Sequence, residues 1–381
     1  MRSMFSRLFI LGLVLAFAFG TVGCGGGGEK KADTIKIGVI APLSGNQASI
    51  GKGVVDGMQS AAKIINGSGG LGGKQIELIV LDDRNLPDEA VSAAKKLISG
   101  EKVSIILGSI GSSSTAAIQQ LTMKQKVVLV TPVSMLPKLS QNNDQYFFRV
   151  TATAPIREQS FSEFVSKKLN AKTIAFLASN EDLGRATVAA ATNLYEKSGN
   201  PKPVYTGFYD PGATDFSAEL NRIKSLSPDV LYIVANSVQA SMIVKQVKVL
   251  QLKSVLIGSG EAATQEFLRL SQGAGEGMYI PVDWAVSFDD PASKKFLEAF
   301  QKDYNKLPET KFAVQGWETM WIVAEAIKRV EGPLTSDKLR DQMRKTDWLG
   351  PRGKWAFDAN GDPVLKTYIS QVKGNDFIIA K

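Results

Sequence analysis

The chain alternates short apolar runs rich in Val, Ile and Leu with longer stretches whose apolar residues recur at helical spacing. The first run, residues 35–40, is followed by a stretch that places Val54, Met58 and Ile65 on one helical face. Continuous apolar runs suit strands that are buried on both faces of a sheet, and strand–helix alternation favours parallel strands with right-handed crossovers. The pattern therefore predicts an α/β fold built on parallel sheets.

The alternation occurs in two successive sets, one reaching residue 150 and one from 173 to 282, and a tail with a different pattern follows. The tail offers helical stretches first and β-like runs last, at 355–358, 365–372 and 377–379. We expect its helices to complete the first set and its strands to complete the second. This predicts two doubly wound parallel-sheet lobes joined by a hinge of three crossovers. The predicted N-terminal lobe is 34–153 plus 283–354, and the C-terminal lobe is 154–282 plus 355–381.

The first residues have the pattern of an export signal. Arg2 and Arg7 precede an apolar run at 8–19, which is shorter than the roughly 20 residues that a membrane-spanning helix needs. Small residues then lead to Cys24, as in a bacterial lipoprotein signal. We predict a signal peptide at 1–23, lipidation of Cys24, and a glycine-rich tether at 24–33. An ordinary secretory signal with an unrelated cysteine is the alternative.

Two residue types that dominate enzyme and metal sites are nearly missing. Of 381 residues none is His and one is Cys. This excludes catalytic triads that use His and metal sites built on His or clustered Cys, and we expect no cofactor. Adjacent acidic pairs such as Asp82-Asp83 would point to opposite faces of a strand, so the sequence favours a protein that is not an enzyme. Basic residues are scattered, with no basic block interleaved with aromatics, so nucleic acid is not an expected partner.

Gly- and Ser-rich loops follow several predicted strands, where open α/β sheets bind ligands. Ser112 and Ser113 follow the run at 103–107 and would begin a helix, where hydroxyls and free amides can receive a carboxylate. Alternatively, one of these serines only caps the helix. Other candidate positions after strands are Val133, Ser134, Met135, Asn236 and Glu261. Glu261 would either pair with a ligand ammonium or stabilise a helix N-terminus.

Several motifs resemble those of the periplasmic leucine/isoleucine/valine-binding family, the receptor components of ABC importers. They include IKIGVIAPLSG at 35–45, GGLGG at 69–73, SSST at 112–115 and TP at 131–132. The resemblance covers nearly all of residues 34–381. It implies the type I periplasmic binding protein fold, a ligand held between the lobes and capture by closure of the hinge. It also implies a permease partner and a location in the periplasm or cell envelope, with the membrane reached only through the anchor at Cys24.

The resemblance assigns roles to particular positions. It implies that Ser112 holds a ligand carboxylate and that the backbone at Val133 receives an ammonium. The family tends to have an aromatic residue where this chain has Ile50, Thr at Met135, Tyr at Leu183 and an acid near Gly260.

These departures leave the ligand class open. An ammonium buried without a partner costs several kcal/mol, so the departures affect amine recognition more than carboxylate recognition. We expect a small apolar amino acid, with an amine-free aromatic or branched carboxylate, or a role in ligand sensing, as alternatives.

Overall fold

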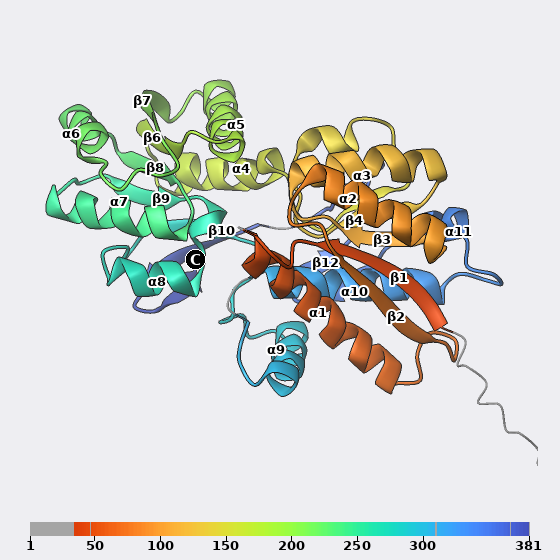
Figure 1. The fold of residues 1–381 in the computed structure, drawn as a ribbon. Coiled ribbons are helices and arrows are strands. Elements are labelled where there is room, and N and C mark those ends of the chain that lie inside the picture. The colour runs from red at the N-terminus through yellow and green to blue at the C-terminus, as the bar shows by residue number, and fades with distance from the viewer. Residues whose placement is uncertain (1–33, 46, 309–310, 366, 381) are drawn as a thin grey trace, which may run out of the picture. The chain divides into compact units, whose positions relative to one another are not determined.

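The computed structural model describes residues 34–45, 47–308, 311–365 and 367–380 (Figure 1). Within these ranges it does not describe the side chains of Ala154, Pro155, Asp182 and Leu183. Cys24 and the predicted signal peptide and tether lie outside the described residues. In the ranges that are described, no helix combines the length and the apolar composition needed to cross a membrane.

The first sheet is wholly parallel, with strand order β2-β1-β3-β4-β5. One face packs on α1, α9, α10 and α11, and the other packs on α2 and α3 (Figure 1). Both faces are therefore buried, as the continuous apolar runs predict. The strands are β1 (Thr34–Ala41), β2 (Gln75–Asp82), β3 (Ile105–Gly108), β4 (Val128–Thr131) and β5 (Phe147–Arg149). The helices are α1 (Ala48–Gly67), α2 (Pro87–Lys95), α3 (Ser112–Gln125), α9 (Pro291–Tyr304), α10 (Phe312–Lys328) and α11 (Ser336–Met343).

The second sheet has the order β14-β13-β10-β9-β8-β6-β7. Strands β6 to β10 are parallel to one another. At one edge β13 pairs antiparallel with β10, and β14 pairs antiparallel with β13. Helices α4 and α5 cover one face, and α6, α7 and α8 cover the other. The strands are β6 (Thr173–Ser179), β7 (Lys202–Tyr209), β8 (Val230–Val234), β9 (Val255–Gly258), β10 (Tyr279–Val282), β13 (Tyr368–Lys373) and β14 (Asp376–Ile379). The helices are α4 (Ala154–Glu163), α5 (Asp182–Ser198), α6 (Ser217–Leu226), α7 (Ser237–Val249) and α8 (Gln265–Ser271).

The chain passes between the two sheets three times. It leaves the first sheet after β5, returns after β10, and joins the second sheet again at β13. The predicted α/β class, with two doubly wound lobes and a three-crossover hinge, is confirmed.

One predicted strand lies elsewhere. The run at 355–358 does not join the second sheet, because Trp355 ends β12 (Gly353–Trp355), which pairs only with β11 (Trp348–Gly350). Trp355, Phe357 and Leu365 all pack on the core of the first sheet. We therefore propose that the last crossover lies between Leu365 and Tyr368 rather than at residue 355.

Two glycines allow α1 and α10 to pack at short distance. A Cβ atom at Gly57 would lie 1.9 Å from the carbonyl oxygen of Ala313, and one at Gly316 would lie 1.9 Å from that of Val54. Any larger side chain would force the two helices apart. The contact fixes the start of α10, and hence Lys311 immediately before it, against the first lobe.

Candidate functional site

The first part of the site is a pair of serines on neighbouring loops of the first sheet. Ser112 is the first residue of α3, and Ser134 follows β4. The hydroxyl of Ser134 donates to the hydroxyl oxygen of Ser112 at 3.1 Å. Ser134 is buried and Ser112 is half-buried. Because Ser112 accepts this bond, its own proton is available to an anion at the positive end of the α3 dipole. We call these two residues the hydroxyl pair.

Hydrogen bonds from side chains to backbone hold the two loops in place. The hydroxyl of Thr131 accepts from the Ser134 N–H at 3.1 Å and donates to the Ser109 carbonyl at 2.9 Å. The hydroxyl of Thr115 donates to the Gly111 carbonyl at 2.8 Å. The loop after β3 is thereby tied to the loop after β4, which fixes the hydroxyl pair without using the Ser112 hydroxyl as a donor.

The remaining predicted residues of the first lobe are Ile50, Val133 and Ser113, and the contact of a ligand ammonium with the backbone at Val133 stays a prediction. Ile50, in the first turn of α1, and Val133 are half-buried and pack against the first core. Ser113 is exposed. The structure therefore brings Ser112, Ser134 and Met135 together and leaves Ser113 at the surface.

The second part of the site is built on charged side chains. Glu261 lies in the short helix Gly260–Ala262 after β9, and its Oε1 is 2.9 Å from Nη1 of Arg157, in the first turn of α4. The other amino group of Arg157 contacts the sulfur of Met135. Since Met135 directly follows Ser134, this contact links Arg157 to the loop that carries Ser134.

Further charges surround this ion pair. Asp283, at the second crossover, binds Nη1 of Arg352 at 2.8 Å. Glu318 of α10 pairs with the same guanidinium, and its Oε1 accepts from the Arg352 N–H at 2.8 Å. The amine of Lys311 is 3.5 Å from the carbonyl oxygen of Gly260. We call the set Arg157, Glu261, Asp283, Lys311, Glu318 and Arg352 the charge cluster.

The cluster shifts the pKa of its members away from their usual values. Burial by itself would raise the pKa of Glu261, but the charges of Arg157 and Lys311 outweigh it and lower that pKa to about 2. Burial would likewise raise the pKa of Asp283, yet Lys311 and Arg352 hold it below its usual range. Burial lowers the pKa of Lys311, against the opposing attraction of Asp283. Both acids are therefore anionic at neutral pH and already balanced by cations.

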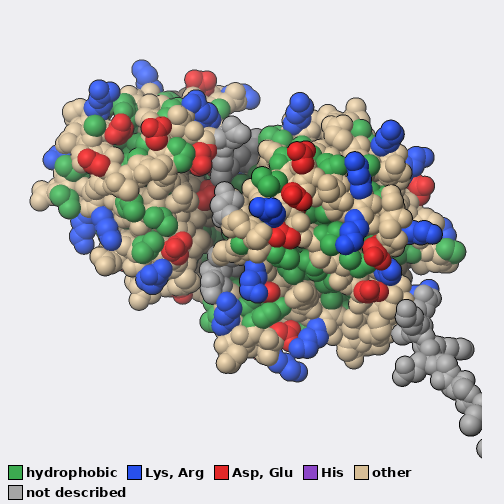
Figure 2. Space-filling view, in the orientation of Figure 1, with side chains coloured by type: hydrophobic (Ala, Val, Ile, Leu, Met, Phe, Trp, Pro, Cys, Tyr) green, Lys and Arg blue, Asp and Glu red, His purple; other side chains and the backbone are tan. Residues whose placement is uncertain are grey.

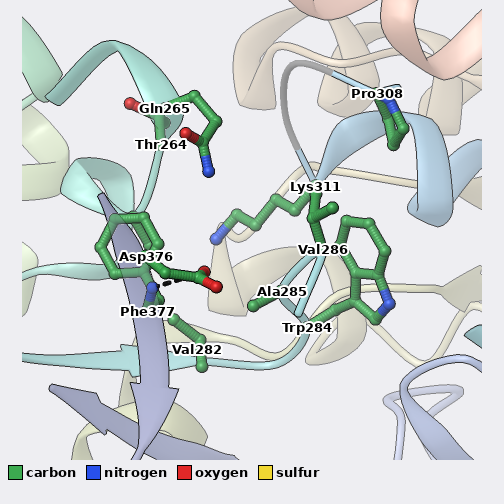
Figure 3. A pocket seen from close by; sticks show the side chains of 11 residues that line it. Thr264, Gln265, Val282, Trp284, Ala285, Val286, Pro308, Lys311, Asp376 and Phe377 are labelled. Carbon is green, nitrogen blue, oxygen red and sulfur yellow. Dashed lines mark hydrogen bonds between the residues drawn. The ribbon is translucent and has the colours of Figure 1, made fainter. Parts of the chain in front are cut away.

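Small cavities border the cluster. One of about 10 Å³ lies among the crossovers, lined by residues that include Thr151, Arg157 and Asp283. Another, of about 20 Å³, lies where Lys311 extends toward Gln265 and Asp376 (Figure 3). Each has room for about one water molecule and not for an amino acid. We infer that a solute would be held by the loops themselves.

Asn236 and Leu183 are the other two residues that were predicted to line the site from the second lobe. Asn236 is the N-cap of α7: its side chain accepts from the Gln239 N–H at 3.0 Å. Asn236 therefore acts as a helix cap, a role that polar residues between a strand and a helix often have. Leu183 lies in the first turn of α5, but its side chain is outside the described part of the structure.

Sequence reasoning missed Arg157 and Lys311. Both occur in stretches that read as ordinary amphipathic helix, where a solvated cation is the usual outcome. One available signal was position, because Arg157 follows the first predicted crossover, so its helix starts at the hinge. The pairing with Glu261, 104 positions away, had no signal in the sequence.

The comparisons with known proteins cover almost the whole chain. Residues 34–376 match the periplasmic binding protein family. The leucine-, isoleucine-, valine-, threonine- and alanine-binding protein of Pseudomonas aeruginosa is 26% identical over 94% of this chain and 92% of its own length.

Two solved structures share the fold. The branched-chain amino acid transporter substrate-binding protein LivJ of Streptococcus pneumoniae, in complex with isoleucine, is 27% identical, with a TM-score of 0.79 over 92% of this chain and 100% of that chain. A solute-binding protein of an ABC transporter from Rhodopseudomonas palustris BisB5, in complex with 3,4-dihydroxybenzoic acid, is 25% identical, with a TM-score of 0.80 over 91% of this chain and 96% of that chain. The chain belongs to the periplasmic binding protein family of the Leu/Ile/Val type, whose members are extracytoplasmic solute-binding receptors of ABC importers rather than enzymes.

Proposed function

We propose that this receptor captures a small carboxylate with an apolar body and presents it to the membrane permease of an ABC importer. The observation that carries the proposal is the hydroxyl pair at the start of α3. Ser134 donates to Ser112 at 3.1 Å, which orients the free Ser112 proton and leaves it available at the helix N-terminus. A carboxylate there gains a hydroxyl donor and backbone N–H groups together.

The apolar body would lie against the half-buried Ile50 and Val133 and beside Met135. A small apolar amino acid is the first candidate class. It is supported by the relative named as a leucine-, isoleucine-, valine-, threonine- and alanine-binding protein and by the neighbour bound to isoleucine. An amine-free aromatic or branched carboxylate is the second, supported by the Arg157–Glu261 ion pair and by the neighbour bound to a dihydroxybenzoic acid. Arg157 and Glu261 complete the site on the side of the second lobe.

Capture would proceed by closure about the three crossovers. Ligand binds to the loops of one lobe, and contacts made only in the closed form favour closure. Because ligand binds the folded state alone, saturating ligand should raise the melting temperature. The anchor at Cys24 would keep the receptor near its permease, and Cys24→Ser should release the protein from the membrane fraction.

Calorimetry with leucine and with 4-methylpentanoate tests the carboxylate site. We expect heat of binding with at least one of them, and Ser112→Ala should weaken that binding about tenfold or more, the cost of one charge-assisted hydrogen bond. Ser113→Ala is the matched control, since Ser113 is the next residue on the same helix and is exposed. The proposal would be refuted if Ser112→Ala left the binding unchanged. It would also be refuted if none of the four ligands leucine, 4-methylpentanoate, phenylalanine and 3-phenylpropanoate gave heat of binding.

A further inference from the structure

Glu261 and Asp283 already form ion pairs with arginines of the chain itself. Glu261 Oε1 lies 2.9 Å from Arg157 Nη1, and Asp283 Oδ2 lies 2.8 Å from Arg352 Nη1. A ligand ammonium that leaves water needs an anionic or carbonyl partner, or it loses several kcal/mol of solvation. An amino acid would therefore have to compete with Arg157 for Glu261.

We propose that Arg157 is a specificity-determining residue, which disfavours an α-ammonium by holding Glu261 and so makes the site select amine-free carboxylates. The inference rests on the proposed carboxylate site at Ser112 and deepens it by naming the ligand class. Arg157 acts here by occupying the acid and by placing a fixed cation beside it.

The ion pair is too well buried to exchange freely with solvent. The side chains of Arg157 and Glu261 are 11% and 23% exposed. A pair in this position is screened far less than a surface pair, and removing one partner leaves a buried charge uncompensated. The backbone N–H of Arg157 also donates to the Thr153 carbonyl at 3.1 Å, which holds the residue in the first turn of α4.

The charges of the cluster already balance without a ligand. Arg157, Lys311 and Arg352 face Glu261, Asp283 and Glu318, and each of these three acids forms an ion pair with an arginine of the cluster. An incoming ammonium would add a cation beside Arg157 and Lys311, and the carboxylate oxygens there that lack a hydrogen-bond partner among the described residues, Asp283 Oδ1 and Glu158 Oε2, are buried. A carboxylate at Ser112 would be met by a hydroxyl and by helix N–H groups. The free-energy penalty therefore applies only to the ammonium group of an amino acid.

Contact through Met135 links the ion pair to the ligand loop. Arg157 Nη2 touches the Met135 sulfur, and Met135 follows Ser134 of the hydroxyl pair. A ligand whose carboxylate sits on Ser112 would have its next atoms at this junction. The residue that discriminates between ammonium and hydrogen there is therefore Arg157.

The test uses two matched pairs of ligands that differ only in the ammonium: leucine with 4-methylpentanoate, and phenylalanine with 3-phenylpropanoate. Calorimetry on the full chain gives the ratio of the two affinities within each pair. For at least one pair we expect the amine-free acid to bind about tenfold tighter or more. Arg157→Met keeps an unbranched stem and frees Glu261, and it should shift the ratio toward the amino acid by about tenfold. Arg157→Lys keeps a cation at the position and should shift it much less.

Two further variants separate specificity from stability. Glu261→Gln removes the only acid that Arg157→Met frees, so the double variant should lose the shift. Arg185→Met removes an exposed arginine that lies over Phe208, and it should leave the ratio unchanged. Melting curves of each variant show whether it is folded.

The outcomes distinguish this inference from the proposed function. Tighter binding of the amino acid by the wild type, or an unchanged ratio in Arg157→Met while Ser112→Ala still weakens binding, would overturn the role of Arg157 alone. Failure of all four ligands to bind, or binding indifferent to Ser112→Ala, would overturn the carboxylate site and this inference with it.

Discussion

The hydroxyl pair and the charge cluster are linked through Met135 but are built in different ways. The hydroxyl pair is uncharged, and residues of two neighbouring loops support it. The charge cluster joins Arg157, Glu261, Asp283 and Arg352, drawn from the crossovers and from distant parts of the chain. Changes in the first region should therefore alter affinity with little loss of stability, whereas changes in the second should alter both.

The largest expected effect comes from Glu318 in the charge cluster. Glu318→Ala would leave the fully buried Arg352 without one of its two carboxylates and Trp355 without its acceptor. Breaking a buried pair in this way costs about 3–5 kcal/mol of the free energy of unfolding. Urea unfolding would measure it. Glu325→Ala, which breaks the exposed pair with Lys328, is the control and should cost less than about 1 kcal/mol. Equal losses in the two variants would show that the cluster does not stabilise the hinge.

The second expected effect is a pH dependence of stability that comes from Glu158, next to Arg157. Burial raises the pKa of Glu158 to about 7 from 4.5, although Tyr232 donates a hydrogen bond to it at 2.9 Å. The folded state thus holds this proton more tightly than the unfolded state, so stability falls as pH rises from about 4.5 to 7. Glu158→Gln should remove the penalty and stabilise the protein by up to about 3 kcal/mol at pH 8. Urea unfolding at pH 8 and pH 4 tests this, since the gain should nearly vanish at pH 4. A gain that is the same at both pH values would contradict the assignment.

Asn236 separates a capping role from a ligand role. Because its side chain caps α7, Asn236→Ala should lower the free energy of unfolding by about 1 kcal/mol. Calorimetry on the same variant should give an unchanged ligand affinity. A loss of affinity without a loss of stability would place Asn236 in the binding site instead.

The smallest effect belongs to Ser113. Its side chain is exposed at the second position of α3, so Ser113→Ala should change the free energy of unfolding by less than about 0.5 kcal/mol. Thermal melting with and without ligand would check this. If Ser113→Ala abolished the ligand-induced rise in melting temperature, the carboxylate would have to be assigned to Ser113 rather than Ser112.

The sequence predicted those parts of the molecule that depend on local pattern. Apolar periodicity located the strands of both sheets, and the Gly-Ser loop after β3 led to Ser112, which begins α3 as expected and whose role with a ligand stays a prediction. Pattern failed where elements are short or where packing decides. Helix α8 (Gln265–Ser271) was not predicted, because seven residues carry little periodicity. Of the strand expected at 355–358, only Trp355 lies in a strand, the end of the β11–β12 hairpin, and its side chain packs in the first core.

Apart from Glu261, the charged half of the site could not be predicted from the sequence, for a related reason. An arginine on an amphipathic helix is usually solvated, and only the folded chain brings Arg157 to Glu261. Scattered charge is the rule on this molecule: on the face shown in Figure 2, basic side chains lie singly among acidic ones. Which of them are buried together is a property of the crossovers and not of any motif.

The internal balance of charge in the cluster has a consequence for ionic strength. Three cations and three anions held within one group present little net field to their surroundings, and the partly or fully buried pairs are poorly reached by salt. The stability that the cluster contributes should therefore change little between dilute buffer and concentrated brine. In a receptor whose acid had no paired cation, the affinity for a cationic group would instead fall as electrolyte is added.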